Sequence, residues 1–194
     1  MPVDVTQLRA DTVAISGHKF YGPKGSGAIY VRRGLHLSPI VFGEPREMGL
    51  RPGSENIPAC VGLGAAASLA GRCSAEAAES LGLLRDRFVS RLTGLISPEP
   101  LSLCHDSPRL PNTVAVEMPG DARRLQRAAR KLVVATAQSE TPPDEITRTL
   151  RAIGRSELQI KRTLRISLGW TTSQEQVDRA ADLLAEAWDG LAVG

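Results

Sequence analysis

The chain has 194 residues, and its 24 basic against 21 acidic side chains leave a net charge of +3, too small to indicate a nucleic-acid partner. Hydrophobic residues make up 42% and charged residues 23%, which is typical of a globular protein and excludes a disordered or collagen-like chain. No apolar run approaches the ~18 residues of a membrane span, and no secretory signal is visible. We therefore expect no membrane contact and a cytoplasmic location. The 3 cysteines have irregular spacing, which argues against a disulfide framework.

Two short strands are predicted near the N-terminus. The β-branched run 11–16 is typical of a buried strand, and 28–31 forms a second strand. The glycine-rich segment 22–27 between them predicts a hairpin-like unit at the edge of a sheet. A long irregular passage follows as far as Pro58, and loops of that length in compact domains usually serve a function.

Helices are predicted next. The alanine-rich segment 59–70 predicts a closely packed helix, and 74–96 predicts a long helix with one apolar stripe. The stripe consists of residues three or four positions apart, namely Leu81, Leu84, Phe88, Leu92 and Leu95. Because Pro98 and Pro100 end this helix, we place a domain boundary between residues 97 and 98.

Beyond that boundary short strands alternate with helices. This order indicates a small α+β domain over 98–194, with helices covering one side of a small sheet. The predicted strands are 101–104, 112–118, 132–137 and 164–168. The predicted helices are 121–131, one that begins at 141–144 and ends at Gly154, and one opened by a capping box of Ser173 and Gln176.

The first candidate site follows the first strand and consists of Ser16, Gly17, His18 and Lys19. Partial desolvation at a strand end favours the uncharged amine of a lysine, which is the form that makes a Schiff base. The hydroxyl, imidazole and glycine-rich backbone groups beside it are suited to a phosphate. On composition alone a solvated turn lysine is the favoured interpretation, and the spacing of a nucleotide P-loop is absent.

Three further features of the sequence bear on ligand binding. Arg165 lies inside an apolar strand, where a buried guanidinium needs an anionic partner such as a carboxylate; an edge-strand arginine that points to water is the equally favoured alternative. The nearest feature to a basic patch is a set of cations expected on one side of a helix, where a solvated face is the favoured interpretation. It comprises Arg123, Arg124, Arg127, Arg130 and Lys131. The histidines share no ligand spacing with the cysteines, apart from the adjacent Cys104 and His105, so no metal site is predicted.

Three motifs, in this order along the chain, resemble the pyridoxal-phosphate (PLP)-dependent cysteine desulfurase and selenocysteine lyase family. They are 16–25, 51–56 and 164–169, and the segment 109–113 looks closest to the selenocysteine lyase branch. These are fold-type-I enzymes grouped with the class-V aminotransferases. The resemblance implies an α/β fold: the end of the PLP-binding large domain with a remnant of its sheet over 1–97, and a small α+β domain over 98–194.

The resemblance implies a role for each matching residue. Lys19 is the implied Schiff-base lysine and later the base that moves protons, while Ser16 and His18 contact the cofactor phosphate. Ser54 takes the place of a hydroxyl that reaches the phosphate of the neighbouring subunit, which implies a homodimer. Arg165 is the implied ligand of the α-carboxylate of a small amino-acid substrate. PLP supplies the electron sink.

The chain departs from this family in two respects. Gln138 stands where the family has its persulfide-forming cysteine, and an amide neither accepts sulfur nor protonates selenide. The nearest substitute, Cys104, has a strand-end position that indicates a core residue. The N-terminal half of the family, with the residues that stack on the pyridine ring and pair with its nitrogen, does not precede Val3. We expect the strands that remain to leave an edge and an apolar face open.

Three hypotheses for function follow. The first is a truncated homologue whose activity class is removal of sulfur or selenium from cysteine or selenocysteine to give alanine, with little or no activity alone. The second is one half of a split PLP enzyme, completed by a separate N-terminal half. The third is a non-catalytic partner of a desulfurase subunit. Gln138 favours an altered reaction, such as amino transfer or another lyase step.

Overall fold

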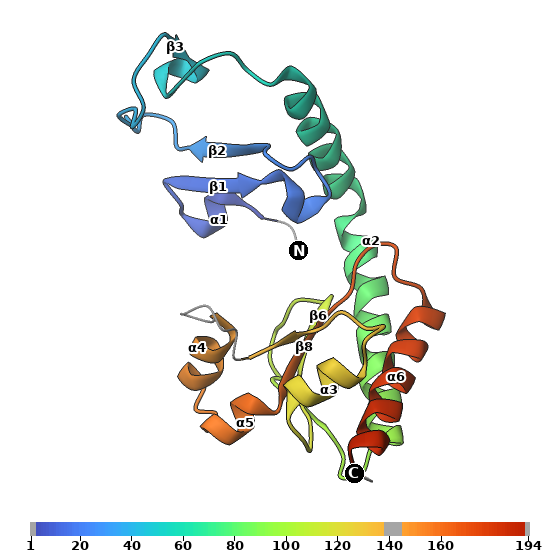
Figure 1. Cartoon of the computed structure of the whole chain (residues 1–194). Helices are drawn as coiled ribbons and strands as arrows, with labels where there is room; N and C mark the ends of the chain where they lie inside the picture. Colours follow the sequence, from blue (N-terminus) through green and yellow to red (C-terminus); the bar gives the residue numbers. More distant parts are fainter. Residues whose placement is uncertain (1–2, 138–144, 193–194) are drawn as a thin grey trace. The chain divides into compact units, whose positions relative to one another are not determined.

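The computed structural model describes residues 3–137 and 145–192. The chain divides into two compact units, Met1–Ala75 and Glu76–Gly194, each of which is described here by itself. The division lies inside the long helix α2 (Ile57–Leu95), drawn in green in Figure 1. The domain boundary at 97/98 stays a prediction, but the second half of α2 belongs with the C-terminal unit because its apolar stripe packs there.

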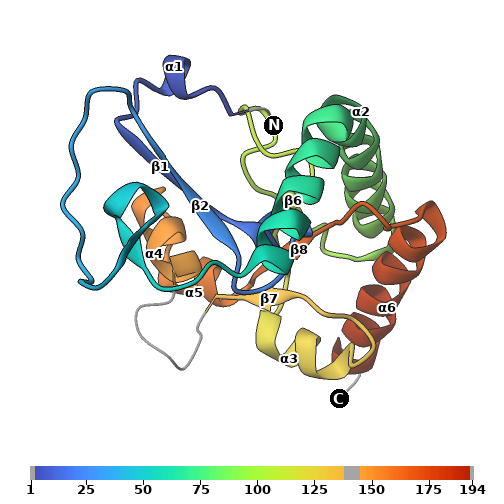
Figure 2. The ribbon, with the colours of Figure 1, turned by 90° about the horizontal axis from the view of Figure 1, so that it is seen from above.

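The first unit consists of short elements and the start of α2. Its other elements are α1 (Val5–Leu8), β1 (Thr12–Ser16), the 3₁₀ turn η1 (Gly17–Phe20), β2 (Gly27–Val31), β3 (Pro45–Arg46), the 3₁₀ turn η2 (Glu47–Gly49) and β4 (Arg51–Pro52). Strands β1 and β2 lie side by side in both Figure 1 and Figure 2 and pair antiparallel, from Thr12 opposite Val31 to Ser16 opposite Gly27. The predicted hairpin is therefore confirmed.

The first unit has almost no interior. Among its described residues, 3–75, Gly17 alone is buried. The prediction of a buried strand over 11–16 is wrong, because every residue of β1 except the half-buried Val13 is exposed. The physical reason is that β1 and β2 form a sheet of only two strands, and a sheet of that size has no neighbouring strands or covering layer to exclude water.

Helix α2 is a single helix, whereas the sequence predicted two helical segments, 59–70 and 74–96. It continues through Gly71, because a glycine inside a helix costs only about 1 kcal/mol and does not by itself end it. The residues 59–70 are mostly exposed, so the predicted close packing is also wrong. Within the described residues, α2 included, no helix is both long enough and apolar enough to cross a membrane.

The second unit contains an antiparallel sheet with helices. Its elements after α2 are β5 (Leu101–Ser102), β6 (Thr113–Glu117), α3 (Ala122–Ala128), β7 (Ala135–Thr136), α4 (Glu145–Ala152), α5 (Glu157–Lys161), β8 (Thr163–Ser167) and α6 (Gln174–Ala192). The strand order is β5-β6-β8-β7, so the two short strands lie at the edges. All the predicted strands are present, although β5 and β7 are both shorter than expected. The helix start predicted at 141–144 lies outside the described residues.

The main core of the second unit lies between one face of this sheet and helices α2, α3 and α6. Strands β6 and β8 alternate, so that one set of side chains faces these helices. The largest fully buried members are Phe88, Leu92, Val116, Met118, Leu125, Leu164, Val177 and Leu184. A smaller cluster includes Leu103, Leu150 and Ile160 together with Ala115 from the opposite sheet face. The predicted one-sided cover therefore describes the main core, and α4 and α5 add a second, smaller one.

Caps and ion pairs fix the last helix. Ser173 and Gln176 form the predicted capping box, with the Gln176 side chain accepting from Ser173 N at 2.9 Å and Ser173 Oγ accepting from Gln176 N at 3.2 Å. The Arg87 guanidinium of α2 donates two hydrogen bonds of 2.7 Å each to Asp178 of α6. These hydrogen bonds hold the pKa of Asp178 below its ordinary value.

Replacing Phe88 by alanine should destabilise the second unit by about 3–5 kcal/mol, because the ring is 1% exposed and its loss leaves a cavity in the main core. Leu83 on the same helix exposes 69% of its surface and serves as the matched control. Its alanine variant should change the free energy of unfolding by no more than about 0.5 kcal/mol. Urea denaturation followed by circular dichroism measures both; equal losses would contradict the assigned core.

The Arg87–Asp178 pair should make stability depend on pH. Because the folded-state pKa of Asp178 is lowered, the pair stabilises the fold above the unfolded-state pKa of about 4 and is lost as the pH falls through the folded-state pKa. The variant Asp178→Asn should therefore be less stable than the parent at neutral pH and equal to it at the acid end. Denaturation across this pH range, with Asp189→Asn as a control on the same helix, tests the difference.

Candidate functional site

Lys19 lies in η1, the single 3₁₀ turn that follows β1. Two backbone hydrogen bonds hold this turn: Gly17 N donates to Ser26 O, and Gly22 N donates to Gly17 O, each at 2.9 Å. A Cβ added to Gly17 would collide with the Ser26 side chain, so the close approach requires glycine here. The backbone that carries the lysine is therefore fixed at both ends of the turn.

The glycine-rich connection between β1 and β2 rests on the first turns of α2. Ser26 Oγ donates to Pro23 O at 2.6 Å and closes this connection into a compact turn. Pro23 in turn packs on α2 at Gly62, where an added Cβ would lie 2.6 Å from Pro23 Cγ. Leu63, the next helical residue, lies against Gly17. The helix therefore supports the lysine turn at two adjacent positions, through the close approach of Pro23 to Gly62 and through the Leu63 side chain.

The three candidate side chains of this segment, Ser16, His18 and Lys19, are exposed. The partial desolvation that the sequence predicted for Lys19 is not present within the first unit. The reason is the one that leaves β1 exposed: the hairpin has no covering layer among residues 3–75. What the structure does provide is an accessible amine on a rigid turn.

Ser54 is also exposed, in the loop between β4 and α2. The Arg51 guanidinium shapes this loop by donating from Nη1 to Gly53 O at 3.2 Å and to Ser54 O at 3.0 Å. Asn56 Oδ1 accepts from Ala59 N at 3.2 Å and caps the start of the helix. The sequence alone did not indicate these two roles, although an asparagine directly before a helix is a recognised start signal.

The first unit also contains a cavity of about 570 Å³ beside this loop. Its lining comes from the glycine-rich connection, β2, β4 and the start of α2, and includes Arg51, Glu55, Asn56 and Cys60. The lining does not include Ser16, His18 or Lys19. This cavity therefore does not enclose the candidate lysine.

Arg165 lies in the middle of β8, in the second unit. The sequence left two alternatives, a buried arginine and an arginine on an edge strand, and both are wrong. Arg165 is exposed, and β8 is a central strand. Ala115 and Ala135 are its partners on the two neighbouring strands, and these small side chains leave space around the guanidinium. No described residue forms an ion pair with it.

Asn112 holds the end of this strand through two hydrogen bonds. Its backbone carbonyl oxygen accepts from Leu168 N at 2.8 Å, and its side-chain Nδ2 donates to Leu168 O at 3.2 Å.

The segment 109–113 connects the sheet to α2. Arg85 of α2 donates from Nη1 to Leu110 O at 3.2 Å and from Nε to Asp86 Oδ1 at 2.8 Å. Arg109 Nη2 lies 3.5 Å from the same carboxylate oxygen. The hydrogen bonds from Arg85, followed by the two positive charges, hold the pKa of Asp86 below its ordinary value. This motif therefore has a structural role in the second unit.

Cys104 and Gln138 are the two residues that bear on sulfur chemistry. Cys104 is exposed, so its interpretation as a core residue is wrong. The preceding Leu103 takes the buried position, and the chain then turns at Cys104 with φ 54°. Gln138 lies outside the described residues.

A family model described as aminotransferase class V matches residues 1–180. The chain belongs to this family. Cysteine desulfurase IscS of Methanosarcina thermophila is 35% identical over 190 residues, covering 96% of this chain and 46% of that protein. Cysteine desulfurase IscS 1 of Archaeoglobus fulgidus is 36% identical over 186 residues, covering 94% of this chain and 48% of that protein. The resemblance stated from the motifs is confirmed.

Solved structures agree on the fold. A NifS-like protein matches with a TM-score of 0.82 and 30% identity, covering 100% of this chain and 50% of that one. A NifS-like protein from Rickettsia africae matches with a TM-score of 0.85 at 24% identity, covering 97% and 50%, and supports the fold alone. The predicted α/β fold, the C-terminal part of a fold-type-I enzyme, is confirmed. The chain spans about half the length of the curated relatives it matches.

Class-V aminotransferases and cysteine desulfurases are PLP-dependent. The first unit fits one end of this cofactor, because an exposed amine is free to meet an aldehyde and the neighbouring hydroxyl and imidazole suit a phosphate. It does not fit the ring, because a pyridine ring needs an apolar enclosure and Gly17 is the single buried residue among 3–75. The described residues of this unit therefore suit the aldehyde and phosphate groups of the cofactor but do not enclose its ring.

Replacing Gly62 by alanine should loosen the lysine turn, because the new Cβ would lie 2.6 Å from Pro23 Cγ and push the glycine-rich connection away from α2. Gly64→Ala is the matched control, since nothing lies within 4 Å of a Cβ there. Hydrogen exchange at the amides of Gly17 and Gly22 should quicken by about ten-fold in the first variant only. Equal exchange in the two variants would show that the helix does not support the turn.

Proposed function

We propose that this chain supplies the lysine-bearing part of a PLP site of the cysteine desulfurase class, and that a further polypeptide segment completes the site. That segment corresponds to the half of the relatives that the chain does not match. The activity class inherited from the family is removal of sulfur or selenium from cysteine or selenocysteine, leaving alanine, and Gln138 in place of the persulfide-forming cysteine is proposed to weaken it. By itself the chain is proposed to have little or no such activity.

The observation that carries this proposal is the open hairpin. Ile15 exposes 42% of its surface and Ile29 exposes 53%. Ile15 is paired with Ala28, whereas Ile29 is paired with Ala14, so the two isoleucines lie on opposite faces of the two-stranded sheet. Apolar side chains exposed on both faces favour a layer of protein on each side. A covering segment would also supply the enclosure that the cofactor ring needs.

The proposed roles follow the family match residue by residue. Lys19 would hold the cofactor covalently and move protons, with Ser16 and His18 at its phosphate. Ser54, whose loop Arg51 shapes, would serve the phosphate of a second subunit in a homodimer. Arg165 would bind the carboxylate of the amino-acid substrate, a role supported by a guanidinium without an acidic partner among the described residues. PLP supplies an electron sink when bound.

A non-catalytic role as partner of a desulfurase subunit is the second candidate. It is favoured by the loop that precedes α2, where Ile40 exposes 94% of its surface, Phe42 85% and Met48 91%. Large apolar side chains this exposed favour contact with another protein surface. Gln138 also favours this candidate, because its amide offers no nucleophile for sulfur.

Retention of the cofactor tests the proposal. The purified chain is incubated with PLP, reduced with borohydride and analysed by mass spectrometry, alone and with a polypeptide carrying the N-terminal half of a cysteine desulfurase relative. We expect little modification alone and specific modification of Lys19 in the mixture. Lys19→Ala should abolish that modification, whereas Lys24→Ala, an exposed lysine in the adjacent connection, should retain it.

The same mixtures are assayed for alanine and sulfide formed from cysteine. Robust turnover by the chain alone would contradict the proposal of an incomplete site. Formation of a complex in which Lys19 stays unmodified would favour the non-catalytic candidate. Equal modification of the two lysines in every mixture would show that the turn has no special affinity for the cofactor.

A further inference from the structure

The basic patch predicted from the sequence does not lie on one face of a helix. Helix α3 ends at Ala128, and Arg130 and Lys131 belong to the turn that follows it. Ala129 leaves the helical conformation with φ −81° and ψ 54°, and its side chain is buried. Leu132 N donates to Ala129 O at 2.9 Å and closes the turn. Two of the cations are therefore placed apart from the solvated face of α3.

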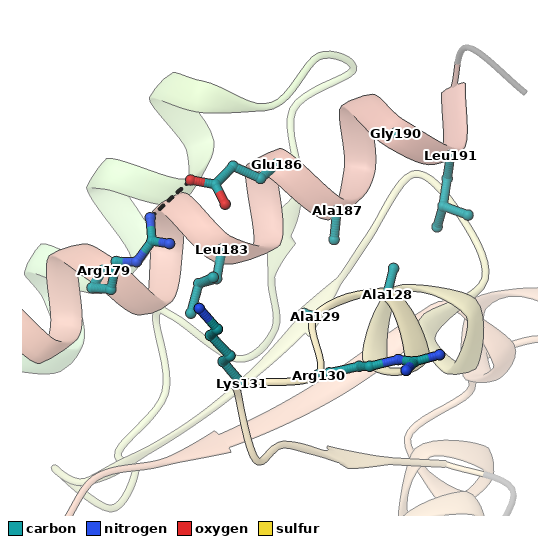
Figure 3. A pocket seen from close by; sticks show the side chains of 10 residues that line it. All are labelled: Ala128, Ala129, Arg130, Lys131, Arg179, Leu183, Glu186, Ala187, Gly190 and Leu191. Carbon is teal, nitrogen blue, oxygen red and sulfur yellow. Dashed lines mark hydrogen bonds and ion pairs between the residues drawn. The ribbon is translucent and has the colours of Figure 1, made fainter.

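This turn forms one side of a groove of about 470 Å³ in the second unit, and α6 forms the other. Figure 3 shows Leu183, Ala187 and Leu191 projecting from α6 toward the turn. Their spacing of four residues places them on one stripe of the helix. From Arg179 to Leu191 the wall is about 18 Å long, at 1.5 Å per residue, which matches roughly three turns of another helix.

The charges around this groove are unbalanced. Glu186, the acidic residue of its lining, is already paired, because Arg179 Nη1 lies 2.8 Å from its Oε1, as the dashed line in Figure 3 marks. Arg130 and Lys131 are exposed and form no ion pair with any described residue. Val133, two residues further along, exposes 98% of its surface. The rim at the turn is thus positive and partly apolar, beside an aliphatic floor.

We propose that this groove docks an amphipathic helix of a partner protein, with its apolar side on the α6 stripe and its acidic side chains beside Arg130 and Lys131. A helix laid in a groove places residues at i, i+4 and i+8 on such a stripe, and opposite charges at the rim set its orientation. The groove belongs to the second unit alone, so the proposal does not depend on Lys19 or on PLP.

Other occupants fit the groove less well. A second copy of this chain, docked with two-fold symmetry through the same groove, would offer the same positive rim and not an acidic surface. Nucleic acid would use the cations, but no aromatic side chain lines the groove to stack a base. A small anion would not cover Leu183 and Leu191, which stay partly exposed on either side of the buried Ala187.

Fluorescence anisotropy of a labelled synthetic peptide tests the proposal with the full chain. The peptide has about four helical turns, leucines at i, i+4 and i+8, and glutamates on the flanking positions. We expect saturable binding that weakens as salt is added, and binding weaker by about ten-fold or more for the same peptide with lysines in place of the glutamates.

Charge reversal locates the site. The double variant Arg130→Glu/Lys131→Glu should weaken binding of the acidic peptide by about ten-fold or more. Arg148→Glu/Lys161→Glu makes the same charge change at exposed positions of α4 and α5 and should alter binding by no more than about two-fold. Leu183→Ala should weaken binding without altering its dependence on salt. Circular dichroism and thermal melting establish that each variant is folded.

Four results would overturn the proposal. They are absence of saturable binding, equal affinity for the acidic and basic peptides, equal losses in the two charge-reversal pairs, and full displacement of the peptide by inorganic phosphate at constant ionic strength. The last result would identify an anion site in place of a helix-docking groove. Self-association of the parent that the Arg130→Glu/Lys131→Glu variant changes would identify a second copy as the occupant.

Discussion

A two-stranded antiparallel sheet cannot cover either of its own faces, and in this chain the turn that bears Lys19 directly follows one strand of such a sheet. The limiting quantity is the apolar surface that can be buried. Two strands and the start of α2 offer too little apolar contact to exclude water from Ile15, Ile29 or the lysine turn. The same lack of cover that leaves the amine accessible leaves these isoleucines in water. Under the proposed function, one covering segment would both bury these isoleucines and complete the cofactor site.

In the first unit, close contacts and hydrogen bonds hold two short segments, the lysine turn and the loop of Ser54. Close backbone approaches at Gly17 and Gly62 hold the lysine turn against the glycine-rich connection and the start of α2, where larger side chains would not fit. Arg51 does the equivalent for the loop of Ser54, through hydrogen bonds to backbone carbonyls. The chain thus positions its candidate residues by backbone geometry, and under the proposed function another segment supplies the enclosing surface. This division of labour agrees with a match to about half of each relative.

The second unit has a hydrophobic core, which the first unit lacks. Its sheet is buried on one face by three helices, and its last helix is capped and paired with α2 through Arg87 and Asp178. Arg165 projects from the other face, between alanines, with Asn112 fastening the end of its strand. Because the backbone of this unit is held by a packed core, exposed groups such as the Arg165 guanidinium and the positively charged turn after α3 keep defined positions. Both the proposed substrate contact and the proposed helix-docking groove rest on this scaffold.

Local patterns were sufficient for much of this protein. The β-branched runs, the glycines between them, the capping box at Ser173 and the three motifs determined the strands, the hairpin, the last helix and the family, because these features depend on residues near in sequence. Burial was decided only by tertiary structure, since it depends on which segments lie above a side chain. Thus β1 and Lys19 are exposed where burial was expected, and Arg165 is exposed on a central strand. Helix α3 likewise ends at Ala128, before the predicted end at residue 131, and no local sequence pattern marks that end.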